Sequence, residues 1–309
     1  MKIDFYFQSP SADPEWAYSH NVAARMLMNR FKEKYKDIEF NQVEYVTKEY
    51  LTNEELYRYD KLLNNTVPSH FVIIINQETK KYFVLGYWDH YYGETVNWDL
   101  ENCVGEFPAF GIQRNHANYE PMERKYIPTS PTNFIQMCET YVDEFYIKNE
   151  PKITPEKPYF RSGNPYLFRE YIHNNDKRFT SYDTWISKRD FIQELSKNSV
   201  MVDINSVAEW SSRSVEAFGL KVAVVRPEFR IQWHNPLIPN YHYAKLDCDN
   251  IADYKLLADA YIDKFEEVKK DKELIHFLTT NARQWYEENC TLEKHVDILE
   301  KLIDINKLA

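Results

Sequence analysis

The residues best suited to chemistry lie in one short stretch, between residues 200 and 225. Residues 200–202 form an apolar run that is typical of a buried strand, and a polar loop follows it. The side chains of interest fall where the next helix is expected to begin: Ser211, Ser212, Arg213 and Glu216. In open α/β sheets, anions bind beside the carboxyl ends of strands, where the N–H groups of a helix N-terminus attract them. Hydroxyls, a guanidinium and a carboxylate at such an edge suit a nucleoside diphosphate and its ribose.

The elements that position this stretch are predicted from hydrophobic periodicity and from end signals. The helix is expected to stop at Gly219, and residues 221–225 start another buried strand. Further strands are predicted at residues 3–7, 38–46, 70–75 and 81–87, the last two joined in a hairpin by the polar turn 77–80. Helices are predicted at residues 16–36, 48–63, 130–147, 251–268, 272–289 and 292–308. The chain is therefore expected to be α/β and to end in a helical tail.

A change in local amino-acid composition predicts the domain organisation. Residues 149–158, which read NEPKITPEKP, contain three prolines and alternating charges, as linkers do. We expect one α/β domain at residues 1–150, a second at 151–290, and a C-terminal helix at 291–309 that packs back toward the first domain. A chain of 309 residues is long enough for two such domains.

Composition narrows the classes of function. Only 6 glycines are present, and neither a GxGxxG nor a Walker-type motif occurs, so the usual dinucleotide and P-loop interpretations lose weight. The net charge of −10 argues against extensive binding to a phosphate backbone. No apolar run reaches the length of a membrane span, and we expect a soluble, cytoplasmic protein. The 4 cysteines are widely spaced without a zinc pattern, so they are expected to be reduced.

Three segments occur in the order found in one family of sugar transferases. They are residues 160–163 (FRSG), residues 202–225 (VDINSVAEWSSRSVEAFGLKVAVV) and residues 240–247 (NYHYAKLD). With the two α/β halves and the helical tail, they resemble the capsule-associated and protein O-glucosyltransferases, which are GT-B glycosyltransferases. The resemblance covers roughly residues 155–290. It implies two Rossmann-like domains that face each other across a cleft, with the acceptor on the first domain and the nucleotide-sugar donor on the second.

The resemblance also implies roles for residues of the second domain. Arg161 and Arg213 would bind the diphosphate, and Ser211 and Ser212 would complete the anion cradle. Glu216 resembles the acid that holds the ribose hydroxyls in many GT-B enzymes. Loops after the next strand are expected to bring other side chains to the donor sugar or base: Arg226, His234 and Tyr243.

Simpler interpretations stay open for these residues. Arg213 could form a surface ion pair with Glu209 or Glu216, since helical neighbours of opposite charge commonly pair. Glu216 could be a solvated helix residue, and a lone histidine or tyrosine is more often packed or on the surface.

A general base for the acceptor hydroxyl is expected on the first domain. Asp89 is the leading candidate because it ends a strand beside aromatic residues, and Asp13 is its first rival. Glu15 lies close to Asp13, and two further candidates stand behind these: His90 and Asp99. A strand-end capping role is the competing interpretation for Asp89.

No DxD pair is flanked by apolar strands, and residues 247–249 (DCD) are expected to form a loop or a helix cap. We therefore expect an inverting, metal-independent transferase without a cofactor, which uses a UDP-sugar. Its acceptor would be a glycan, a protein or modified DNA. One alternative is transfer to hydroxymethylated bases of phage-type DNA, and another is a non-catalytic nucleotide or carbohydrate binding protein. A structural or assembly protein fits the polar helix start least well.

Overall fold

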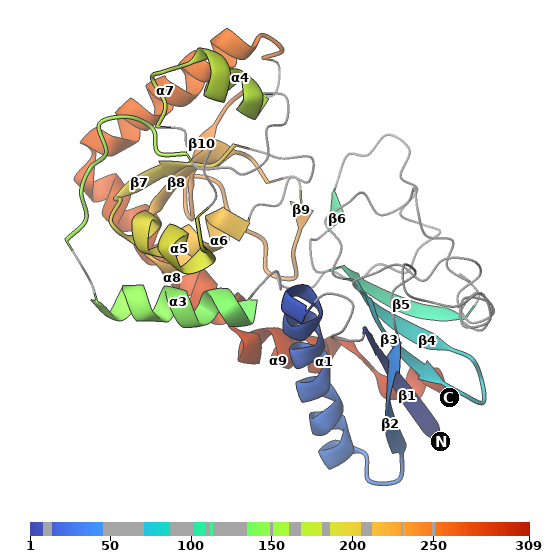
Figure 1. Cartoon of the computed structure of the whole chain (residues 1–309). Helices are drawn as coiled ribbons and strands as arrows, with labels where there is room; N and C mark the ends of the chain where they lie inside the picture. The colour runs from blue at the N-terminus through green and yellow to red at the C-terminus, as the bar shows by residue number, and fades with distance from the viewer. Residues whose placement is uncertain are drawn as a thin grey trace. The chain divides into compact units, whose positions relative to one another are not determined.

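The computed structural model describes the chain in twelve segments: residues 1–8, 14–45, 71–86, 102–108, 112–113, 135–148, 151–160, 168–180, 186–204, 212–229, 231–248 and 251–309. Two compact units emerge, each with its own sheet (Figure 1). Unit 1 comprises Met1–Ile135, Ile231–Asn235 and Leu292–Ala309. Unit 2 comprises Gln136–Arg230 and Pro236–Thr291. The expected α/β class, with two sheets and C-terminal helices, is confirmed.

Unit 1 is built on a mixed sheet in which the strand order is β2-β1-β3-β4-β5. The strands are β1 (Lys2–Gln8), β2 (Glu39–Tyr45), β3 (Phe71–Asn76), β4 (Tyr82–Gly86) and β5 (Cys103–Pro108). β1 pairs parallel with β2 and antiparallel with β3. The predicted hairpin is confirmed, because β3 and β4 pair antiparallel around a turn in which Lys80 has a φ of 63°.

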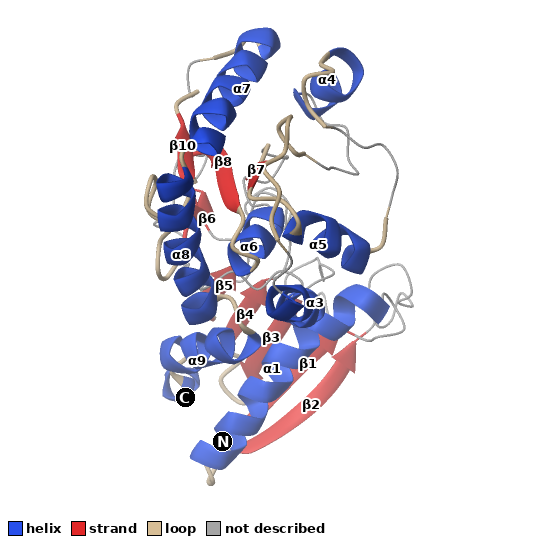
Figure 2. Cartoon of the chain, turned by 90° about the vertical axis from the view of Figure 1, so that its left-hand side faces the viewer, coloured by secondary structure: helices blue, strands red, loops and turns tan. Residues whose placement is uncertain are grey.

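Two helices of unit 1 pack against each other. Helix α1 (Pro14–Lys34) crosses a face of the sheet, and its buried side includes Leu27 and Phe31 (Figure 2). Helix α9 (Leu292–Leu302) packs on α1, and a 3-10 turn follows it (Ile305–Leu308). The Arg30 guanidinium of α1 binds carboxylates of α9, among them Asp297 at 2.7 Å. The C-terminal part of the chain is thereby fixed to the first helix.

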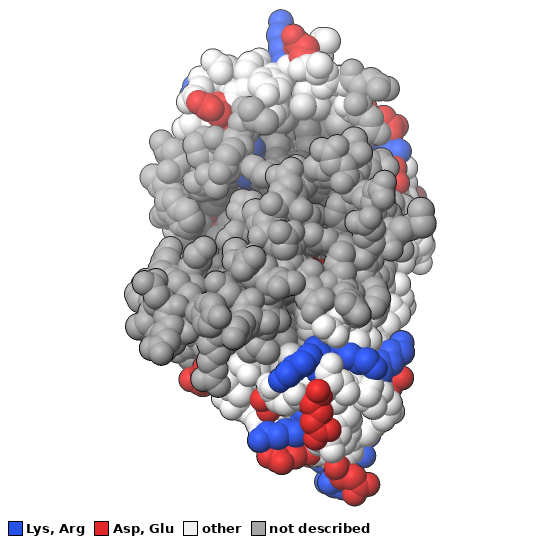
Figure 3. Space-filling view, turned by 90° about the vertical axis from the view of Figure 1, so that its right-hand side faces the viewer, with Lys and Arg blue, Asp and Glu red and all other residues white. Residues whose placement is uncertain are grey.

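The short strands β6 (Ile112–Gln113) and β9 (Ile231–Gln232) pair antiparallel, and both lie in unit 1. Charged side chains at the lower end of this unit are interspersed by sign in Figure 3. Ion pairs across β1 and β2, such as Lys2 with Glu39 at 3.7 Å, fit that pattern. Among the helices that the structure describes, none has the length and hydropathy of a membrane span.

Unit 2 is built on a parallel sheet with the order β10-β8-β7. The strands are β7 (Val200–Val202), β8 (Ala223–Pro227) and β10 (Ala244–Leu246). The helices are α3 (Ile135–Lys148), α4 (Phe168–Asn175), α5 (Lys188–Ser196), α6 (Ser212–Gly219), α7 (Tyr254–Lys270) and α8 (Lys272–Asn289). Helix α7 packs on all three strands, and its Phe265 and Val268 are fully buried in the core.

Residues 151–160 belong to unit 2 through backbone hydrogen bonds. The N–H of Ile153 donates to the carbonyl of Lys197 at 2.8 Å, and the N–H of Ser199 donates to the carbonyl of Ile153 at 2.9 Å. Helix α3, which precedes this stretch, is also tied to unit 2, since Arg189 of α5 pairs with Glu144. The stretch expected to be a linker is thus attached to the end of α5 where the structure describes it.

Candidate functional site

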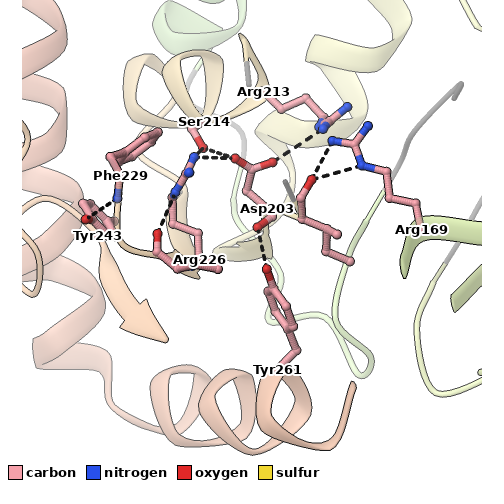
Figure 4. Close-up of polar contacts among 10 residues, drawn as sticks. Arg169, Asp203, Arg213, Ser214, Arg226, Phe229, Tyr243 and Tyr261 are labelled. Atoms are coloured by element: carbon pink, nitrogen blue, oxygen red, sulfur yellow. Dashed lines mark hydrogen bonds and ion pairs between the residues drawn. The ribbon is translucent and has the colours of Figure 1, made fainter. Parts of the chain in front are cut away.

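The candidate site lies at the carboxyl edge of the parallel sheet of unit 2. Strand β7 ends at Val202, which pairs with Val225 of β8, so the residues that follow this pair meet at one edge of the sheet. Asp203 directly follows Val202, and Arg226 directly follows Val225 and still lies within β8. Helix α6 begins nearby at Ser212, and its first turn faces Asp203 (Figure 4). Strand ends and a helix N-terminus therefore converge as the sequence predicts.

Asp203 is the hub of this edge. Its side chain is fully buried, and its Oδ2 accepts hydrogen bonds from the Ser214 hydroxyl at 2.5 Å and from Arg226 Nη1 at 2.8 Å. The Tyr261 hydroxyl of α7 donates to its backbone carbonyl at 3.2 Å. The Asp203 carboxylate thus connects β7 with α6 and β8, and the Asp203 main chain is hydrogen-bonded to α7.

Two further arginines lie beside this carboxylate. Nη2 of Arg213 is 3.6 Å from Oδ1 of Asp203, and the Arg213 side chain is 17% exposed. Arg169 of α4 is buried, and its Nε and Nη2 both donate to the carbonyl of Ile204, at 3.1 and 2.5 Å. The aromatic ring of Phe160 lies 5.8 Å from each of these two guanidinium carbons. Arg169 and Arg213 therefore flank one ring at the same edge of the sheet.

In the described part of the chain, three guanidiniums lie near the Asp203 carboxylate, and each of them lowers its pKa. Burial raises the pKa of Asp203, but the charges of Arg226 and Arg213 and the Ser214 hydrogen bond outweigh it and keep that pKa below its ordinary value. Burial, and then repulsion from Arg213, lowers the pKa of Arg169 to about 9. Several guanidiniums at a helix N-terminus are suited to an anion with more than one negative charge.

Helix α6 directs its two charged residues to different partners. Arg213 faces Asp203, whereas Glu216 is buried and forms an ion pair with Lys188 of α5. Glu216 is therefore enclosed in the described structure and is not a solvated helix residue. Its expected contact to a ribose stays a prediction.

Arg226 and Tyr243 are enclosed by the fold. Arg226 was expected in a loop, but it lies inside β8, because that strand continues to Pro227 in its parallel pairing with β10. Its guanidinium carbon is 3.2 Å from the centroid of the Phe229 ring. The Tyr243 hydroxyl accepts a hydrogen bond from the N–H of Phe229 at 3.2 Å. Phe229 thus contacts both Arg226 and Tyr243, and Arg226 in turn binds Asp203.

The other expected site residues are placed as follows. Ser212 starts α6, and His234 is exposed just after β9, in unit 1. Glu15 lies in the first turn of α1. Several lie outside the described residues: Asp13, Asp89, His90, Asp99, Arg161, Glu209 and Ser211.

Asp203, Arg169, Ser214 and Tyr261 were not expected as site residues. Asp203 had a sequence signal, because a carboxylate directly after a buried strand lies at the ligand-binding edge of a parallel sheet. Arg169 had none, since it is 35 residues away from the carbonyl that it binds.

Metal-binding groups were also considered. Within the described segments, no three His, Cys, Asp or Glu side chains are placed to hold a metal ion. Asp247 is exposed and pairs with Lys245 at 3.1 Å. Cys103 and Cys290 are buried, and Cys248 is half-buried.

Comparisons with known proteins give weak likenesses. No protein-family model matches the chain, and no curated protein matches it significantly. Several solved structures are similar to it, among them the following three. The pneumococcal O-GlcNAc transferase GtfA, in complex with UDP and GlcNAc, is 12% identical with a TM-score of 0.43, over 73% of this chain and 52% of that one. An alpha-glucosyltransferase in complex with UDP and a 13-mer DNA containing a central A:G mismatch is 10% identical with a TM-score of 0.45, over 98% of each chain. TarM is 11% identical with a TM-score of 0.42, over 99% of this chain and 98% of that one.

The matched region thus spans about half the length of the GtfA chain. Identities of 10–12% and TM-scores of 0.42–0.45 are too low to place this chain in a family. The α/β fold is established by the chain's own sheets and helices.

Proposed function

We propose that the protein is a glycosyltransferase that moves a sugar from a nucleoside diphosphate sugar, with UDP favoured, to an acceptor hydroxyl. The observation that carries this proposal is the group of three arginines around a single buried carboxylate, at the carboxyl edge of a parallel sheet and the start of α6. Such an edge is where nucleotides bind in open α/β proteins. Guanidiniums at such an edge can bind phosphate oxygens bidentately, which fits a diphosphate better than a neutral ligand.

The chemistry follows from the charge of the leaving group. The acceptor oxygen attacks the anomeric carbon, the bond from that carbon to the diphosphate oxygen breaks, and a base takes the hydroxyl proton. Negative charge grows on the diphosphate during this step, so fixed cations stabilise the transition state more than the ground state. We assign this role to Arg213, supported by Arg169 and by the N–H groups at the start of α6 from Ser212 onward.

The proposed reaction inverts the anomeric centre and needs no metal ion. A single displacement uses one base, and Asp89 and then Asp13 are the proposed candidates. EDTA should leave the initial rate of transfer unchanged, whereas a strict requirement for manganese would contradict this part of the proposal. Contacts of Arg161, Ser211, Glu216, Arg226, His234 and Tyr243 with the donor stay predictions.

A thermal-shift screen tests the donor class first. UDP, GDP, CMP and their sugars are each added to the protein, because a ligand that binds only the folded state raises its melting temperature. UDP and UDP-sugars should give the largest shifts. If no nucleotide stabilises the protein, the donor site is refuted.

Transfer itself separates the enzyme from a non-catalytic binding protein. Asp89→Asn should abolish release of UDP from UDP-sugar while binding of UDP is retained. Binding of UDP-sugar by the wild type without transfer to any glycan, protein or hydroxymethylated DNA acceptor would favour the binding protein instead.

A further inference from the structure

The two carboxylate oxygens of Asp203 have different surroundings. Oδ2 accepts hydrogen bonds from Ser214 and Arg226, at 2.5 and 2.8 Å. Oδ1 is buried and has no hydrogen-bond donor in the described part of the chain, and it lies 3.6 Å from Nη2 of Arg213. Buried carboxylates normally have both oxygens hydrogen-bonded. Half of this carboxylate is therefore directed at Arg213 without a hydrogen bond to it.

Arg213 is attracted to Asp203 but is not fixed by it. Its Nε is enclosed and has no hydrogen-bond partner among the residues that the structure describes. Its side chain is 17% exposed, whereas Arg226 is fully buried and bonded. Figure 4 shows Asp203 between the two arginines, with Arg226 on one side and Arg213 on the other. Of these two cations, Arg213 is the one that a ligand can reach.

Asp203 itself is held in place by several hydrogen bonds. Its carboxylate is held by two hydrogen bonds, its N–H donates to the carbonyl of Val225 at 2.9 Å, and its own carbonyl accepts from Tyr261 at 3.2 Å. Arg226 and Arg213 keep its pKa low against the effect of burial, so it stays ionised at neutral pH. A fixed negative charge thus lies 3.6 Å from Nη2 of the partly exposed Arg213.

We infer that Asp203 is an internal counter-ion that competes with the bound diphosphate for Arg213 and so limits how tightly the nucleoside diphosphate product is held. This inference rests on the proposed function. A negative charge close to an arginine weakens the attraction of that arginine for phosphate. The product carries more negative charge than the donor, so a site without this counter-ion would release it slowly.

The test removes the charge and keeps the shape. Asp203→Asn should bind UDP and inorganic pyrophosphate about tenfold more tightly than the wild type by calorimetry. Its turnover number should fall, because release of UDP becomes slower. In an Arg213→Ala background, the same change should alter the affinity by less than about threefold, since the competition is for Arg213. Asp176→Asn is the control, because Asp176 is also buried but pairs with Arg178.

A second variant keeps the test decisive if Asp203→Asn does not fold. Asp203→Asn leaves Arg226 buried without its carboxylate, which is costly, whereas Asp203→Asn with Arg226→Gln removes both buried charges. Asp203 lies between Arg226 and Arg213, with its Oδ1 3.6 Å from Arg213, so the double variant should also bind pyrophosphate more tightly, by a few fold.

Equal or weaker binding by the folded variants would overturn the inference while the proposed function stands. A wild type that binds neither UDP nor pyrophosphate would overturn the proposed function, and the inference with it.

Discussion

Replacing Arg226 by methionine tests whether this arginine supports the site from within. Arg226 and Asp203 are both fully buried, and their atoms approach to 2.8 Å. Removing one partner of such a pair leaves an uncompensated buried charge, which typically costs about 3–5 kcal/mol. The variant also loses the hydrogen bond to Ser214 and the contact with the Phe229 ring. We therefore expect Arg226→Met to be among the most destabilising single changes in unit 2.

The assay must report on unit 2 alone, because the chain contains two compact units. Amide hydrogen exchange of β8 does so, since these amides exchange through opening of the parallel sheet. A loss of about 3 kcal/mol corresponds to exchange faster by more than about a hundredfold. The pKa of Asp203 should at the same time rise, because Arg226 lowers it most among the three arginines beside it.

Arg178→Met is the matched control. Arg178 lies in the same unit and pairs with Asp176 and Asp259, but its side chain is 48% exposed. Ion pairs in contact with water contribute at most about 1 kcal/mol. Suppose that Arg226→Met lowers the stability of unit 2 no more than Arg178→Met does, and that it chiefly weakens nucleotide binding. Arg226 is then a ligand-binding residue, and the structural role assigned to it is wrong.

Three further changes have defined outcomes. Gly219→Ala places a methyl group 2.6 Å from the Val142 side chain, in a packed contact. The free energy of unfolding in urea should therefore fall by about 1–3 kcal/mol. An unchanged stability would mean that α3 and α6 can move apart. His242 is buried, and burial lowers its pKa to about 4, so it stays neutral in the folded protein. In the unfolded chain it becomes protonated below about pH 6.5. The free energy of unfolding should therefore fall by on the order of 2 kcal/mol from pH 7 to 4.5. His242→Gln should remove that share, and an identical pH profile for the variant would refute it. Arg30→Met should loosen α9 from α1 by about 1 kcal/mol at low salt and by less in 1 M salt, whereas a loss that does not depend on salt would point to packing instead.

Local patterns predicted most of the elements that the structure describes. The run at Val200–Val202 is a strand, α6 ends at Gly219, and α8 spans Lys272–Asn289 as its periodicity indicates. The hairpin of β3 and β4 followed from its polar turn. These features depend on neighbours in sequence, so the sequence alone could supply them.

Partners distant in sequence could not be predicted in this way. Glu216 pairs with Lys188, and Arg169 reaches the carbonyl of Ile204, because α5 and α4 pack beside α6 and β7. Burial also decides the role of a residue: Arg226 has the same side chain as Arg213, yet it lies inside β8, fully buried, and binds Asp203. Residue type predicted an anion site here, but packing determines which arginine faces outward.

The most direct test of the central claim is the affinity of UDP and of uridine for the wild type and for Arg213→Ala. Arg189→Ala serves as the control, since Arg189 lies on α5 and pairs with Glu144 with its side chain 44% exposed. Arg213→Ala should weaken the binding of UDP by at least about tenfold and change the affinity for uridine little. The reason is that the lost contact is to the diphosphate. Arg189→Ala should bind both as the wild type does. Two results would contradict the claim that this cluster holds the diphosphate of a sugar donor. One is a wild type that does not bind UDP, and the other is an Arg213→Ala variant whose affinity for uridine falls as much as its affinity for UDP.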